Sequence, residues 1–142
     1  MMNLAEVLIN ADKKKLTELQ TKEYEVKRLS DLLGTPFVLT LQEIPPRRSI
    51  EINQQAVKMN IDAKSSQKVD VDVFTLQMLT LVEGIKSGLG DKELLKSYEC
   101  ATVKELYVKI FKAKEIAAIA EEINSLGNYT GSEREDVEEV KN

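Results

Sequence analysis

Apolar residues recur at intervals of three and four through much of the second half of this 142-residue chain. The clearest stripe consists of Val71, Phe74, Met78, Leu81, Val82 and Ile85. An α-helix repeats every 3.6 residues, so this spacing places the six side chains on one face. The stripe therefore predicts a helix from about Asp70 that packs against a core. Gly88 and Gly90 predict its end, since glycine favours the left-handed conformation of a helix cap.

Three further helices are predicted toward the C-terminus. Asp91 is a good N-cap for a short helix that extends to Tyr98. Thr102 and Glu105 have the spacing of a capping box, in which the hydroxyl and the carboxylate each accept a backbone N–H. The helix that this box opens would bury Val103, Leu106, Tyr107, Ile110 and Phe111. A last helix from about residue 113 to Gly127 would bury Ile116, Ile119, Ala120, Ile123 and Leu126.

The N-terminal part combines helical and strand-like segments. Helical spacing of Leu4, Val7 and Leu8 predicts a short amphipathic helix over residues 3–10, followed by an irregular segment over 11–22. An alternating pattern over 23–29 and the β-forming run over 37–41 predict two strands, which a short connection containing Gly34 would join. Such a hairpin is marginal by itself, so its apolar face must pack on helices.

Two prolines, Pro45 and Pro46, end the second predicted strand. Proline is favoured in the first turn of a helix, so a helix from Pro46 to about Asn60 is expected next. Residues 62–67 are small and polar and predict a flexible loop.

Length and composition fit one domain followed by a tail. Aromatic residues make up 5% of the chain and tryptophan is absent, so the core must consist mostly of aliphatic side chains. We expect a mostly helical α+β domain over residues 1–129, with an N-terminal β-hairpin packed against a bundle of short helices. Residues 130–142 are acidic and poor in apolar side chains, and we expect them to form a mobile tail.

The residue types argue against catalysis. The chain has no histidine, which removes most general-base, triad and zinc arrangements, and Cys100 is its one cysteine. We therefore expect no catalytic residue, no cofactor site and no metal site, and a protein that is not an enzyme.

Charge and hydropathy restrict the partners and the compartment. The chain has 24 acidic and 20 basic side chains and a net charge of -4, without the basic excess that nucleic-acid binding needs. Its N-terminus does not resemble a signal peptide, and its apolar runs are too short to span a bilayer. We expect a cytoplasmic protein that binds neither nucleic acid nor membrane.

Several apolar stripes compete for one core in this short chain. By default each stripe is core, because helical periodicity is the usual signature of a buried face. A protein that binds a partner or self-associates also needs exposed apolar surface, however, so part of a stripe could bind a partner. Four residues are our candidates for partner binding: Phe111, Ile116, Ile119 and Ile123.

Three blocks of sequence follow one another over most of residues 20–129. The first is Glu25–Ser30 with Gly34–Phe37, the second is Leu81–Ile85 with Asp91–Leu95 and Tyr98, and the third is Ala101–Leu106 with Glu115, Ile116 and Ile123–Tyr129. In this order they resemble the tail assembly chaperone family of long-tailed phages and defective prophages of Gram-positive bacteria. The resemblance departs at Lys114, where a glycine is expected, and at Asn128, which interrupts a Gly-Tyr pair.

The resemblance implies a non-enzymatic protein that acts during assembly and is absent from the mature particle. Such a protein would bind the tape measure protein, a long helical rod with exposed apolar seams, and would help to recruit tail tube subunits. It would do so in the host cytoplasm, and self-association into a homo-oligomer is also expected.

A small structural tail component, such as a tube, completion or baseplate subunit, is the alternative. It would share the small size, the lack of catalytic residues and the tendency to self-associate. Stable incorporation into purified particles would distinguish it from a chaperone.

Overall fold

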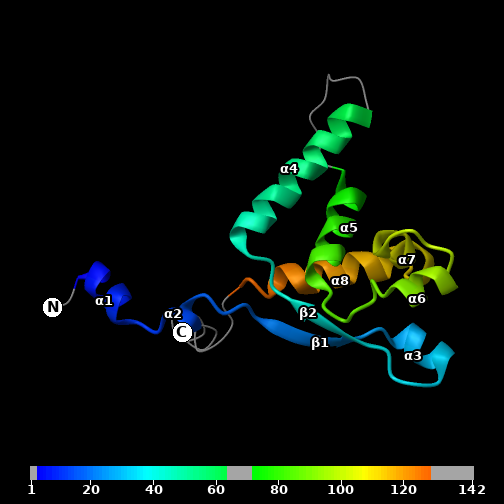
Figure 1. Ribbon diagram of the computed structural model, residues 1–142, viewed down its shortest axis with the longest axis horizontal. Helices are drawn as coiled ribbons and strands as arrows, with labels where there is room; N and C mark the ends of the chain where they lie inside the picture. The colour runs from blue at the N-terminus through cyan, green and yellow to red at the C-terminus, as the bar shows by residue number, and fades with distance from the viewer. Residues whose placement is uncertain (1–2, 64–71, 129–142) are drawn as a thin grey trace, which may run out of the picture.

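The computed structural model of the protein describes residues 3–63 and 72–128. These residues form eight helices and two strands (Figure 1). In chain order the elements are α1 (Leu4–Asn10), α2 (Lys13–Leu16), β1 (Thr21–Glu25), α3 (Lys27–Leu33), β2 (Val38–Gln42), α4 (Pro46–Ala63), α5 (Val73–Gly84), α6 (Lys92–Ser97), α7 (Val103–Ile110) and α8 (Ala113–Ser125). The predicted tail over 130–142, residues 64–67 of the predicted loop, and Val71 lie outside the described residues.

The mostly helical α+β fold is confirmed. Helix α8 packs against α5 and also contacts β2, while α3, α6 and α7 gather at one end of the molecule and α1 and α2 project from the other (Figure 1). The buried core is almost entirely aliphatic, as the composition predicted. Its side chains come from α3, β2, α5, α7 and α8 and include Leu29, Leu39, Leu41, Met78, Leu81, Tyr107, Ile119 and Ile123.

Two strands pair in antiparallel fashion, with Thr21 opposite Gln42 and Glu25 opposite Val38. The first predicted strand, over 23–29, is correct only up to Glu25, because residues 27–29 belong to α3. The predicted short connection between the strands is wrong for the same reason. Leu29 and Leu33 are four residues apart and therefore share one face of this helix. Gly34, with a φ of 72°, then provides the left-handed cap.

The end of α5 differs from the prediction in a way that extends the sheet. The helix ends at Gly84, before the predicted cap at residues 88–90. Ile85 is extended and forms a bridge with Leu41, and the Lys86 N–H donates to the Thr40 carbonyl at 2.8 Å. This segment therefore satisfies backbone groups on the edge of β2 that does not pair with β1.

Local capping explains several other boundaries. The Asp91 carboxylate accepts the Leu94 N–H, and Thr102 and Glu105 form the predicted capping box. The predicted irregular segment over 11–22 is wrong in part, because Asp12 caps α2 by accepting two backbone N–H groups. The start of β1 also lies within that segment.

Gly84, the last residue of α5, lies directly against Ile123 of α8. A Cβ atom built on Gly84 would lie 2.6 Å from Cδ1 of Ile123, well inside the contact distance of two carbon atoms. The Ile123 side chain is itself only 1% exposed and has little room to move. The two helices can therefore pack at this distance only with glycine at position 84.

We expect Gly84→Ala to lower the free energy of unfolding by about 1–3 kcal/mol, because an added methyl group in a packed core forces its neighbours to shift. Urea denaturation followed by circular dichroism measures this change. Gly90→Ala is the matched control, since a Cβ there would meet its nearest atom, in Val103, only at 4.0 Å. Equal stability of the two variants would contradict the close packing of α5 on α8.

Candidate functional site

An apolar groove lies between α3, α6 and α7 and encloses about 100 Å³. Helices α3 and α7 contribute two side chains each, α6 and the residue that follows it contribute one each, and so do the segments that precede β2 and α6. The lining residues are Leu29, Leu33, Phe37, Leu89, Leu94, Tyr98, Leu106 and Ile110. The groove can therefore take up large aliphatic side chains from a partner.

The groove has a buried floor and an exposed rim. Leu29 and Leu106 on the floor are 8% and 1% exposed, whereas Leu33 and Tyr98 on the rim are 57% and 44% exposed. Large apolar side chains on a rim lose contact with water when a partner covers them, which favours binding. This surface is accordingly suited to a protein partner with an apolar face.

The groove rests directly on the core. Phe37, which lines the groove, packs edge to face on Phe111 with 6.4 Å between ring centroids, and Tyr107 also packs on Phe111 at 5.6 Å. Burial raises the pKa of Tyr107 to about 12, so this core phenol stays neutral at physiological pH. The residues that line the groove itself include no acidic or basic side chain.

The helices that form the groove have more basic than acidic residues, although the pairing of Arg28 with Glu115 of α8 offsets the excess of α3. Each of α3, α6 and α7 contains two basic residues and one acidic residue, although the whole chain has a net charge of -4. Charges of this kind around an apolar surface favour partners that carry acidic side chains beside their apolar face.

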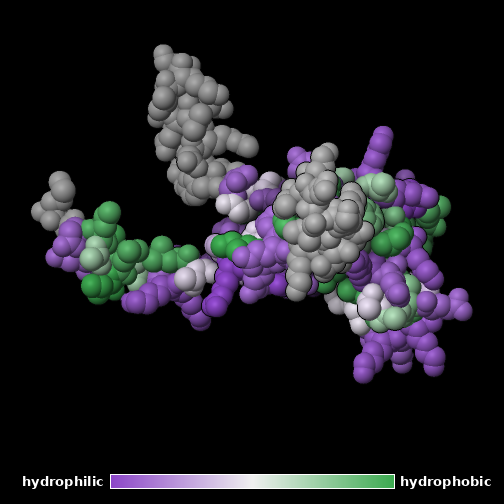
Figure 2. Space-filling view, turned by 90° about the horizontal axis from the view of Figure 1, so that it is seen from above, coloured by the Kyte–Doolittle hydropathy of each residue, from purple (hydrophilic) through white to green (hydrophobic). Residues whose placement is uncertain are grey.

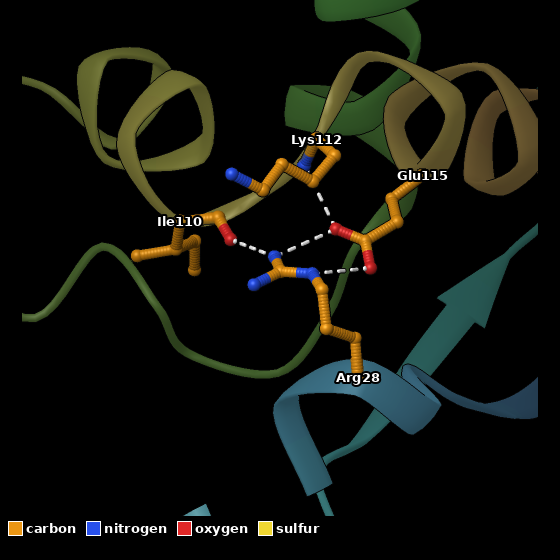
Figure 3. A network of polar contacts seen from close by, with 4 residues as sticks. All are labelled: Arg28, Ile110, Lys112 and Glu115. Atoms are coloured by element: carbon orange, nitrogen blue, oxygen red, sulfur yellow. Dashed lines mark hydrogen bonds and ion pairs between the residues drawn. The ribbon is translucent and has the colours of Figure 1, made fainter. Parts of the chain in front are cut away.

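Arg28 joins the α3 wall to the corner between α7 and α8 (Figure 3). Its Nε and Nη2 donate to the two carboxylate oxygens of Glu115 at 2.9 and 2.8 Å, and Nη2 also donates to the Ile110 carbonyl at 2.7 Å. The Lys112 N–H donates to Glu115 Oε1 at 2.8 Å. One ion pair thus satisfies backbone groups at the end of α7 and at the start of α8.

The charge of Glu115 depends on this arrangement. The hydrogen bonds from Arg28 lower the pKa of the Glu115 carboxyl, and this effect outweighs the opposing effect of desolvation. The carboxylate is therefore fully ionised at neutral pH, where it holds α3 against α7 and α8.

A second exposed apolar feature is the N-terminal arm, which we define as residues 3–17. Leu4, Val7 and Leu8 of α1 are 82%, 46% and 58% exposed, and Leu16 of α2 is 58% exposed. Figure 2 shows hydrophobic side chains, in green, gathered on the part of the molecule that projects from the body. The predicted amphipathic helix is present, and its apolar face points into solvent.

The four predicted partner-binding residues lie together in the core. Phe111, Ile116, Ile119 and Ile123 are at most 4% exposed. The interpretation of this stripe as core is confirmed, while a role of these residues in partner binding stays a prediction. Phe111 is nearest to the groove, through its contact with Phe37.

The groove could not be deduced from the sequence. Leu94, Leu106 and Ile110 lie on the helices predicted for them and Tyr98 follows the end of α6, but the exposure of a side chain depends on how the helices pack together. The shortness of α6 was an available signal, because a six-residue helix with two leucines and a tyrosine after it covers little of its neighbours.

Other kinds of site find no support in the described part of the chain. No group of His, Cys, Asp or Glu side chains within residues 3–63 and 72–128 could hold a metal ion. Across the same ranges, no helix combines the length and the apolar character needed to cross a membrane.

Comparison with known proteins places the chain in a family. The family model described as phage XkdN-like tail assembly chaperone protein matches residues 5–141. This match covers nearly the whole sequence, so the chain belongs to that family of tail assembly chaperones. No curated protein sequence matches the chain.

A solved structure supports the fold. The crystal structure of the protein YqbN, a target of the Northeast structural genomics consortium, aligns with a TM-score of 0.55 and 14% sequence identity. The alignment covers 84% of this chain and 98% of YqbN. At this identity the likeness concerns the fold alone.

We expect Glu115→Gln to lower the stability of the fold at neutral pH and to make that stability less dependent on pH in the acid range. The lowered pKa means that the stability which Glu115 provides is present above its ordinary pKa of 4.5 and is lost as the pH falls through the lower folded value. Urea denaturation between pH 7 and about pH 3 should show the variant and the wild type converging at low pH. Glu121→Gln, at an exposed position of α8, controls for the lost charge. Parallel curves for Glu115→Gln and the wild type would contradict the role of this pair.

Proposed function

We propose that this tail assembly chaperone binds the tape measure protein of its phage or prophage and helps to recruit tail tube subunits to it. The groove between α3, α6 and α7 is the proposed contact, and its occupant is an amphipathic helical segment of the tape measure protein. The chaperone would act in the host cytoplasm and would leave before the particle is complete.

The observation that carries this proposal is an apolar groove with an exposed rim on a member of a chaperone family. A groove lined by leucines between helices is a common receptor for the apolar face of a helix. The excess of lysines in α6 and α7 favours a helix whose apolar face has acidic neighbours. These properties describe a segment of a long helical rod better than they describe a small ligand.

The mechanism requires reversible covering of apolar surface. A long rod with exposed apolar seams aggregates unless the seams are covered, because burial of apolar area is favourable between any two such surfaces. Chaperone copies would cover the seams first, and tube subunits would replace them as the tail grows. The four core residues Phe111, Ile116, Ile119 and Ile123 would contribute by supporting the groove from below.

The test is co-expression of the full chain with the tape measure protein from the same genome. We expect the tape measure protein to stay soluble and to co-purify. Leu33→Glu should reduce the co-purified amount by about tenfold or more, because complex formation would bury a charge on the groove rim. Circular dichroism of the purified variant checks its fold.

Leu32→Glu is the matched control for this variant. It changes a neighbouring leucine of the same helix that is 70% exposed and does not line the groove, so it should not alter co-purification. Loss of binding in both variants, or in neither, would contradict the groove as the contact. An absence of binding by the wild type, together with stable incorporation into particles, would favour the structural tail component.

A further inference from the structure

The N-terminal arm contains a helix that has no cover within the described part of its own molecule. All residues from Asn3 to Asn10 are exposed, although Leu4, Val7 and Leu8 share one face of α1. A helix of seven residues is marginal in water and gains most of its stability when its apolar face is packed against another segment. The apolar face of α1 therefore needs a segment that covers it.

Helix α2 places positive charge close to this face. Its three lysines, Lys13, Lys14 and Lys15, are exposed, and within residues 3–63 and 72–128 no acidic side chain forms an ion pair with them. The Asp12 carboxylate instead accepts the backbone N–H groups of Lys14 and Lys15. Residues 3–17 contain three basic and two acidic side chains, which gives the arm a net charge of +1. An acidic segment is therefore attracted to α2.

The described chain ends beside the base of the arm. Glu43 Oε1 accepts the Gln20 N–H at 3.0 Å just before β1 begins, and the Glu43 N–H donates to the Gln20 carbonyl at 2.8 Å. Oε2 of the same carboxylate lies 3.7 Å from the position that a Cβ atom on Gly127 would take. Figure 1 shows the chain that leaves α8, in orange, running toward the side of the body from which α1 and α2 project. The sequence beyond Asn128 therefore continues from a point next to the arm.

The C-terminal segment, which we define as residues 129–142, has the composition that the arm requires. It contains five acidic and two basic residues, a net charge of -3, together with Val137 and Val140. Val140 is thirteen residues beyond Gly127, and an extended chain of that length spans about 45 Å. Lys15 is five residues before Gln20, which corresponds to at most about 18 Å. The segment is thus long enough to reach both helices of the arm.

The other long segment outside the described residues matches the arm poorly. Residues 64–71 contain two lysines and one aspartate, so their net charge is +1. They connect α4 to α5, and Figure 1 shows that the ends of these two helices joined by this segment point away from the arm. Charge and position therefore both favour the C-terminal segment.

We propose that acidic residues of the C-terminal segment pair with the lysines of α2 in the same molecule and bring Val137 and Val140 onto the apolar face of α1. The contact is intramolecular, because both segments leave the body at one place and each is therefore at a high effective concentration near the other. Exposed ion pairs are weak one by one, so the contact is reversible and depends on ionic strength. It covers apolar side chains that would otherwise be open to aggregation. The contact involves no residue of the groove, so it goes beyond the proposed function and does not depend on it.

The first test is cross-linking of the full chain with a carbodiimide, which joins a lysine amine to a carboxylate that touches it. Mass spectrometry of the monomeric product should show lysines of α2 joined to acidic residues of the C-terminal segment. The yield should fall by about fivefold or more in about 1 M sodium chloride, because salt screens exposed ion pairs. Lys92 and Lys96 are exposed on α6, at the opposite end of the molecule, and should not be joined to this segment.

Two cross-linking results would overturn the proposal. Equal joining of the segment to the lysines of α2 and of α6 would show that it has no preferred place. Cross-links that occur only in covalent dimers would show that the arm is covered by the segment of a second copy.

Hydrogen exchange of the α1 amides tests whether the helix is covered. The combined substitutions Lys13→Gln, Lys14→Gln and Lys15→Gln remove the charges and keep a similar helix propensity. We expect the α1 amides of this variant to exchange about fivefold faster than those of the wild type, or more, because the cover is lost. The matched control combines Lys92→Gln and Lys96→Gln with Lys104→Gln in α7, and should leave the exchange of α1 unchanged.

A variant of the C-terminal segment completes the test. Glu133→Gln, Glu135→Gln and Glu138→Gln combined should speed the exchange of α1 as much as the lysine substitutions in α2 do. An effect of the lysine substitutions alone would overturn the proposal, because it would then belong to α2 itself. Equal exchange of α1 in the wild type and in every variant would overturn it as well.

Discussion

The close approach of α5 to α8 at Gly84 is the constraint on which the rest of the structure depends. A core with few aromatic residues gains its stability from many close aliphatic contacts, and Gly84 lets Ile123 fill the space where a side chain would otherwise stand. Helix α5 ends at the same residue, which places Ile85 beside Leu41 of β2. One helix contact therefore also positions the sheet, because the chain that leaves α5 pairs with the edge of β2.

The groove lies between helices that the packing of α5 on α8 leaves partly uncovered. Helices α3, α6 and α7 contain six to eight residues each and lie at one end of the fold, where few other elements can cover their leucines. The ion pair of Arg28 with Glu115 fixes α3 relative to the corner between α7 and α8. The helices around the groove therefore stay in position although the groove is open. Exposed leucines persist there because charged residues on the same helices keep the surface hydrated.

Local signals in the sequence predicted most elements, and tertiary contacts decided the rest. The capping residues Asp91 and Thr102 act within one turn of their helices, so their effects can be deduced from spacing alone. Ile85 fitted a helical stripe but became extended, because a distant strand offered it hydrogen bonds. Leu106 and Ile110 have the same spacing as Ile119 and Ile123, and only the assembled fold makes the first pair line a groove while the second pair fills the core.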